Sequence, residues 1–282
     1  IPDYGPANQK YSDCGATIPS SRKQRISNHG IKLKKASSSQ STGLFSRIIL
    51  NIIRQMSTMY EALIRFIRDW YQTNDFVPLH EPRFTDKDRD YVLDAIDSSF
   101  VSSIGPYVDR FEEQLSAFMG AKKAIVTVNG TAALQVALKL AGVEPETEVI
   151  VQPLTFIATV NAITYNNASP VFVDIDPDTL GLSPSAVESF LNTRCEIRNK
   201  QVWNKTTQRR VAAILPMHTF GFPCHIETLC ETGRKWNLPV VEDAAESIGS
   251  TVRGKHCGTF GQTGILSFNG NKTITCGGGG AI

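Results

Sequence analysis

The chain has 282 residues, 41% hydrophobic and 20% charged, so it can bury the core of one large domain or two small ones. Its net charge of +2 conceals an asymmetry, since residues 1–55 carry +7 and leave −5 for the remainder. That acidic remainder is unlike a nucleic-acid binder, and no uncharged apolar run reaches the roughly 18 residues of a membrane span. We therefore predict that neither nucleic acid nor a membrane is a partner.

The basic leader, residues 1–55, is rich in Ser and Lys and shows little apolar periodicity, which predicts disorder. Two interpretations stay open. The leader is a basic, serine-rich targeting peptide, or it is upstream sequence and translation starts at Met56 or Met59. Residues 43–71 are apolar but interrupted by charged residues, which predicts an amphipathic helix.

From Thr85, a helix-cap candidate, the pattern becomes regular and predicts two helices, the second ending at Gly120. Residues 192–210 are polar and basic, which predicts an exposed insertion. Strands are predicted at 124–128, 148–152, 170–174, 211–215, 238–242 and 264–268, and helices from Gly130, at 155–166 and around 225–236. This alternation predicts an α/β fold for a domain of residues 56–282, with a mainly parallel sheet and helices on both faces.

Ligands of such sheets bind beyond the carboxyl ends of the strands. Four positions fall there, each directly after or at the end of a predicted strand: Asn129, Pro216–His218, Asp243 and Ser267. The convergence of these positions on one edge predicts a single ligand site.

Asp243 and Lys272 indicate the chemistry of that site. Asp243 follows an apolar strand in Val-Val-Glu-Asp-Ala-Ala-Glu-Ser, and Lys272 ends the polar loop Ser-Phe-Asn-Gly-Asn-Lys. Alone, the first is an ordinary helix cap and the second a solvated charge. Together they indicate pyridoxal 5′-phosphate, because that cofactor needs an amine to hold its aldehyde and a carboxylate to keep its ring nitrogen protonated.

Other residues complete the predicted cofactor site. Gly130 and Thr131 open a helix whose backbone N–H groups can bind a phosphate, and Ser267 can add its hydroxyl. Phe156 is either a ring that stacks on the cofactor or a core aromatic. Glu246, one helical turn after Asp243, either contacts a ring substituent or is a surface charge.

Two other classes of site find little support. The six cysteines form no Cys-x-x-Cys pair, which favours free thiols in a reducing cytoplasm. No Gly-x-Gly-x-x-Gly follows the first strand, which excludes a dinucleotide-binding dehydrogenase. No metal site is predicted, because the sequence spacings match no standard pattern of zinc ligands among His218, Cys224, His225, His256 and Cys257.

Seven segments, in order over residues 77–282, closely resemble the DegT/DnrJ family of sugar aminotransferases. They are Val77-Pro-Leu-His-Glu-Pro-Arg-Phe, Gly105-Pro-Tyr-Val, Asn129-Gly-Thr-Ala-Ala-Leu, Gln152-Pro-Leu-Thr-Phe-Ile-Ala-Thr, His218-Thr-Phe-Gly, Glu242-Asp-Ala-Ala-Glu-Ser-Ile-Gly and Ser267-Phe-Asn-Gly-Asn-Lys. The resemblance implies fold type I, the aspartate aminotransferase-like fold, and a cytoplasmic homodimer with a shared active site. The last segment and the following glycines look most like the subgroup that makes bacillosamine- or legionaminic-acid-type sugars for surface glycans.

The resemblance also implies roles. Lys272 forms the Schiff base, Asp243 pairs with the pyridine nitrogen and Glu246 lies near the ring hydroxyl. Gly130, Thr131 and Ser267 hold the phosphate, and Phe156 stacks on the ring. Glutamate would supply the amino group, and the 4-keto carbon of a nucleotide-linked 4-keto-6-deoxyhexose would receive it.

The chain departs from the family at Gly278, where Glu is usual, and at Ile282, where members continue into a C-terminal small domain. We therefore expect a C-terminally truncated piece that is inactive alone. Two alternatives remain. The family's sugar dehydratases carry histidine where this chain has Lys272, and a non-catalytic regulator of the same fold would need neither Asp243 nor Lys272.

Overall fold

The computed structural model describes residues 60–282, so the basic leader and the expected 55/56 boundary lie outside the described residues. The chain divides into two compact units between Val77 and Pro78. In the first unit, residues 60–71 are helical, which confirms the last part of the helix predicted over 43–71. No helix within residues 60–282 combines the length and apolarity needed to cross a bilayer.

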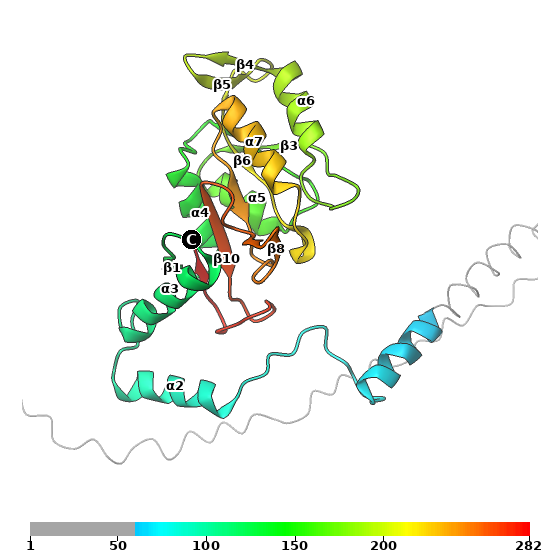
Figure 1. Ribbon diagram of the computed structural model, residues 1–282, viewed down its shortest axis with the longest axis vertical. Helices are drawn as coiled ribbons and strands as arrows, with labels where there is room; N and C mark the ends of the chain where they lie inside the picture. The colour runs from blue at the N-terminus through cyan, green and yellow to red at the C-terminus, as the bar shows by residue number, and fades with distance from the viewer. Residues whose placement is uncertain (1–59) are drawn as a thin grey trace, which may run out of the picture. The chain divides into compact units, whose positions relative to one another are not determined.

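The unit Pro78–Ile282 is built on one central sheet (Figure 1). Its strands are, in spatial order, β3 (Ser169–Phe172), β2 (Glu148–Val151), β6 (Arg210–Leu215), β7 (Val241–Asp243), β10 (Thr263–Ser267), β11 (Gly280–Ala281) and β1 (Val126–Thr127). Parallel bridges from Ile214 to Val240 and from Met217 to Asp243 connect β6 to β7. Among these seven strands, only β11 runs against its two neighbours, so the prediction of a mainly parallel sheet is confirmed.

Helices cover both faces of this sheet. They are α3 (Pro106–Met119), α4 (Gly130–Leu140), α5 (Ile157–Tyr165), α6 (Pro184–Arg194) and α7 (Ile226–Trp236). A further helix, α2 (Asp86–Asp97), buries none of its residues, and a short 3₁₀ helix, η1 (Thr219–Gly221), follows β6. Residues of α4 and α5 share a buried cluster with Val149 and Val151, whereas residues of α6 and α7 share another with Ile150. Because successive side chains of a strand point to opposite faces, these helix pairs lie on opposite sides. Leu115 and Met119 of α3 pack on Leu266 of β10.

Local sequence explains where several helices begin and end. The Asp88 carboxylate accepts the Thr85 backbone N–H at 2.6 Å and the Thr85 hydroxyl at 2.7 Å, which confirms the predicted cap of α2. Pro106 begins α3, and Gly120 ends it with a left-handed φ of 63°. These signals are local in sequence, so the sequence alone predicts where these two helices begin and where α3 ends.

The expectation of an exposed insertion at 192–210 is wrong in part. Two antiparallel strands, β4 (Cys195–Arg198) and β5 (Gln201–Asn204), form a hairpin whose second strand pairs with β6. Val202 is buried, at 1% exposure, because it joins the cluster beneath α6 and α7. A second hairpin, β8 (Thr251–Val252) with β9 (Lys255–His256), was also not predicted.

The glycine run places a strand where a side chain would not fit. Gly280 of β11 pairs with Thr127 on one side and Ser267 on the other. A Cβ atom on Gly280 would lie 2.5 Å from the carbonyl carbon of Asn129, whereas one on Gly278 would meet nothing nearer than 3.9 Å. Close backbone approach therefore requires glycine at 280 but not at 278.

We predict that Gly280→Ala lowers the free energy of unfolding by about 1–3 kcal/mol, because the backbone at Asn129 must move to admit the methyl group. Gly278→Ala is the matched control and should change it by less than about 0.5 kcal/mol. Urea unfolding of both variants measures the difference. Equal losses in the two variants would contradict a specific close approach at Gly280.

Candidate functional site

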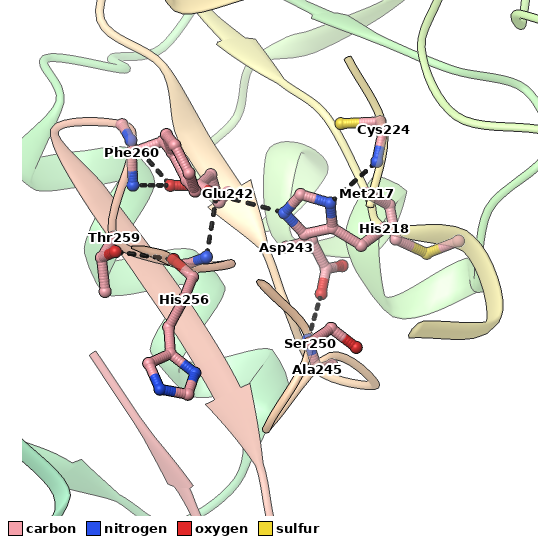
Figure 2. Close-up of polar contacts among 12 residues, drawn as sticks. Met217, His218, Cys224, Glu242, Asp243, Ala245, Ser250, His256, Thr259 and Phe260 are labelled. Atoms are coloured by element: carbon pink, nitrogen blue, oxygen red, sulfur yellow. Dashed lines mark hydrogen bonds and ion pairs between the residues drawn. The ribbon is translucent and has the colours of Figure 1, made fainter. Parts of the chain in front are cut away.

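Asp243 ends β7 and is buried, with 3% of its surface exposed. Its Oδ2 accepts the Thr159 hydroxyl at 2.7 Å. Its Oδ1 accepts the Ala245 backbone N–H at 3.2 Å (Figure 2). Burial raises the pKa of this carboxyl group above its usual value, and the bonds from Thr159 and Ala245 and the charge of Lys272 oppose that shift only in part. The carboxylate retains lone pairs that could accept a further donor.

Thr159 was missed in the sequence analysis. It lies on α5, is fully buried, and its hydroxyl also contacts that of Thr155 at 2.9 Å. Thr159 follows Phe156, the N-cap residue of α5, by three residues, so the two lie near each other at the start of that helix. That spacing was a signal in the sequence, but only the fold shows that the Thr159 hydroxyl donates a hydrogen bond to Asp243, 84 residues later.

Lys272 meets two other predicted residues. Its Nζ donates to Oε1 of Glu246 at 3.1 Å and lies 5.7 Å from the centroid of the Phe156 ring. Only 11% of the Lys272 side chain is exposed, while Phe156 is 62% exposed. Phe156 is therefore not a core aromatic. Glu246 is not a lone surface charge, because its carboxylate accepts a hydrogen bond from Lys272. An amine, a carboxylate and an open aromatic face lie together here.

The first turn of α4 approaches the end of β10. Asn129 caps the helix, its Oδ1 accepting the Ala132 backbone N–H at 2.8 Å. A Cβ atom at Gly130 would lie 2.9 Å from Cβ of Ser267, so the absence of a side chain at 130 brings the helix N-terminus to the Ser267 hydroxyl. Backbone N–H groups of a first helical turn, including that of Thr131, have no partner within the helix and favour an anion.

This arrangement fits pyridoxal 5′-phosphate. The glycine cradle at Gly130 and Ser267 suits a phosphate, Asp243 offers a buried carboxylate, and Lys272 offers an amine beside the exposed ring of Phe156. Asp243 and Ser267 end the neighbouring strands β7 and β10, Gly130 begins α4, and Lys272 lies in the loop after β10.

The His and Cys residues are not gathered into one site. The His218 ring accepts the Cys224 backbone N–H, not its thiol, and the His256 ring lies 4.8 Å from that of Phe118. Within residues 60–282, no group of three or more His, Cys, Asp or Glu could hold a metal ion. The five described cysteines are free thiols, and burial raises the pKa of Cys195, Cys230 and Cys257 to about 11.

We predict that Asp243→Asn stabilises the cofactor-free protein near neutral pH. A carboxyl group whose pKa is raised on folding favours the native state at low pH and loses that stability as pH rises through the folded pKa. The uncharged amide avoids this loss, so the advantage of the variant should grow with pH. Urea unfolding of both proteins as a function of pH tests it, and a variant that is less stable at every pH would contradict a strained buried carboxylate.

Comparison with known proteins agrees with the geometry. Residues 82–282 match the DegT/DnrJ/EryC1/StrS aminotransferase family. The GDP-perosamine synthase of Caulobacter vibrioides is 41% identical over 201 residues, which are 71% of this chain and 50% of that protein. The GDP-perosamine synthase of Escherichia coli O157:H7 is 40% identical over 207 residues, 73% of this chain and 52% of that protein. The chain thus spans about half the length of the curated relatives it matches.

Solved structures show the same relationship. An aminotransferase from Psychrobacter cryohalolentis superposes with a TM-score of 0.63 at 31% identity, over 73% of this chain and 48% of that one. DesI, solved in the presence of its TDP-sugar product, gives a TM-score of 0.60 at 32% identity, over 71% of this chain and 46% of that one. The chain therefore belongs to the DegT/DnrJ/EryC1/StrS aminotransferase family, and its described part has the α/β architecture of the fold type I large domain.

Proposed function

We propose that the protein is a pyridoxal 5′-phosphate-dependent aminotransferase that moves an amino group from glutamate to the 4-keto carbon of a nucleotide-linked 4-keto-6-deoxyhexose. The observation that carries the proposal is the grouping of Lys272, Glu246 and Phe156 beside the buried Asp243. A non-catalytic binding protein would not need an amine and a buried carboxylate together. Lys272 also argues against the dehydratase alternative.

The cofactor, when bound, supplies an aldehyde for amines and a ring that accepts the electrons of a deprotonated carbon. Asp243 would hold a proton on the ring nitrogen, since its carboxylate is buried and already oriented by Thr159 and Ala245. Phe156 would stack on one face of the cofactor ring. Gly130, Thr131 and Ser267 would hold the phosphate at the α4 N-terminus.

Lys272 is the group that would move protons at the substrate carbon. Its Nζ donates a hydrogen bond to the Glu246 carboxylate, which orients the amine. The low exposure of the lysine limits competition from water, which favours transfer between the amine and a bound substrate. The orientation by Glu246 also keeps the amine close to Phe156 and hence to the ring position.

The names of relatives support the substrate class. Three are GDP-perosamine synthases, another is a spore coat polysaccharide biosynthesis protein of Bacillus subtilis, and DesI was solved with a TDP-sugar product. We infer a nucleotide-linked sugar destined for a surface polysaccharide, with bacillosamine- or legionaminic-acid-type sugars as the expected products. We also infer a cytoplasmic homodimer in which a second copy completes the site.

We predict that the full-length protein containing this chain shows a visible absorption band with pyridoxal 5′-phosphate, and that glutamate bleaches it. Lys272→Ala should abolish the band, because the amine that holds the aldehyde is gone. Lys235→Ala is the matched control, since Lys235 lies on α7 in an exposed pair with Glu188 at 2.6 Å. A folded Lys272→Ala protein that keeps the band would reject the catalytic assignment.

A second experiment tests the acceptor. We predict that the protein, given glutamate and a GDP-, UDP- or TDP-linked 4-keto-6-deoxyhexose, releases a 4-amino sugar, identified by mass spectrometry and nuclear magnetic resonance. One nucleotide should be preferred, and Lys272→Ala should lower turnover by at least about a hundredfold. Bleaching by glutamate without an amino sugar from any of the three would retain the aminotransferase and exclude this acceptor class.

A further inference from the structure

Glu242, the residue before Asp243, is a buried acid that the proposed mechanism does not use. Its exposure is 0%, although it is charged and lies in the middle of the sheet. Adjacent side chains of a strand point to opposite faces, so Glu242 faces away from the cofactor site that Asp243 faces. A buried carboxylate costs stability unless donors surround it.

Donors occupy both oxygens of Glu242 (Figure 2). Oε1 accepts the backbone N–H groups of Phe260 and Gly261, each at 2.6 Å. Oε2 accepts the backbone N–H of Gly258 at 2.8 Å and faces Nε2 of His218 at 3.1 Å. One carboxylate thereby fixes the turn between β9 and β10 to the end of β6.

The hydrogen bonds define the tautomer of His218. Its Nδ1 accepts the Cys224 backbone N–H at 3.2 Å and so carries no proton. The proton is therefore on Nε2, which donates to Glu242, and the fully buried ring is neutral. This assignment rests on the donors around the ring.

The backbone of Pro216 and His218 holds the main chain at Asp243. The His218 backbone N–H donates to the Asp243 carbonyl at 3.1 Å, and the Asp243 N–H donates to the Pro216 carbonyl at 2.9 Å. The segment after β6 is thus joined to β7 in two ways. The side chains of His218 and Glu242 meet on one face, and the backbone of Pro216 and His218 bonds to that of Asp243. A shift of Glu242 or His218 would move the Asp243 carboxylate on the other face.

We propose that Glu242, together with His218, is a positioning residue that holds Asp243 against the cofactor ring. The proposal rests on the proposed function, because it needs Asp243 to be the partner of that ring. In Glu242→Gln, one amide oxygen can serve only part of the donor set, and the amide NH₂ group must face other donors. His218 cannot resolve the conflict by moving its proton to Nδ1, since that nitrogen accepts from Cys224.

The test compares Glu242→Gln with Glu148→Gln in the full-length protein. Glu148 is the matched control, because it is a buried acid of the same sheet, 3% exposed, whose Oε2 accepts from Asn204 at 2.9 Å, far along the sheet from Asp243. Both variants should lose stability in urea. Only Glu242→Gln should raise the dissociation constant for pyridoxal 5′-phosphate, by about tenfold or ~1.4 kcal/mol, and move the pH midpoint of the visible band.

A second pair keeps the test decisive if Glu242→Gln does not fold. His218→Leu removes the donor to Glu242 and should weaken cofactor binding and shift the midpoint in the same direction. His218→Gln retains an amide donor and should restore most of both. Wild-type affinity and midpoint in Glu242→Gln, or equal effects of the two His218 variants, would overturn the positioning role.

Asp243→Asn separates this inference from the proposed function. If Asp243→Asn leaves the affinity and the midpoint unchanged, Asp243 is not the partner of the ring and the proposed function fails with it. If Asp243→Asn changes both while Glu242→Gln behaves like Glu148→Gln, the proposed function stands and the positioning role is rejected.

Discussion

The parallel pairing of β6 with β7 is the constraint on which the site depends. Bonds between Asp243 and the backbone of Pro216 and His218 place a carboxylate at the carboxyl end of the sheet, where burial raises its pKa. The fold accepts this unfavourable burial and offsets part of it with the Thr159 hydroxyl and the Ala245 N–H. Burying an ionisable carboxyl group at a candidate ligand site lowers stability in favour of function, which is a common compromise in proteins.

Two neighbouring acids of β7 therefore have opposite surroundings. Glu242 is surrounded by donors on the face away from the site, and Asp243 keeps acceptor capacity on the other face. The alternation of a strand makes this separation possible within two residues. The first acid is suited to hold structure, and the second is suited to bind a protonated ligand.

Glycine serves the site through proximity. Gly130 admits the Ser267 side chain to the N-terminus of α4, and Gly280 lets β11 lie against Asn129. Because β11 is antiparallel between β1 and β10, it connects the strand before the α4 turn with the strand before the Lys272 loop. The N-terminus of α4 and the lysine loop are thus supported by the same short strand.

The sequence by itself determined the helix caps and the alternation of strands and helices, and it supplied the candidate site residues Asp243, Lys272, Phe156, Gly130 and Ser267, because these signals are local or form recognisable motifs. Only the tertiary structure decided that β11 is antiparallel, that 192–210 holds a paired hairpin, and that Thr159 and Glu242 support the site. Those features depend on contacts between residues far apart in the chain. No periodicity or spacing encodes such contacts, since they form only when the strands pair.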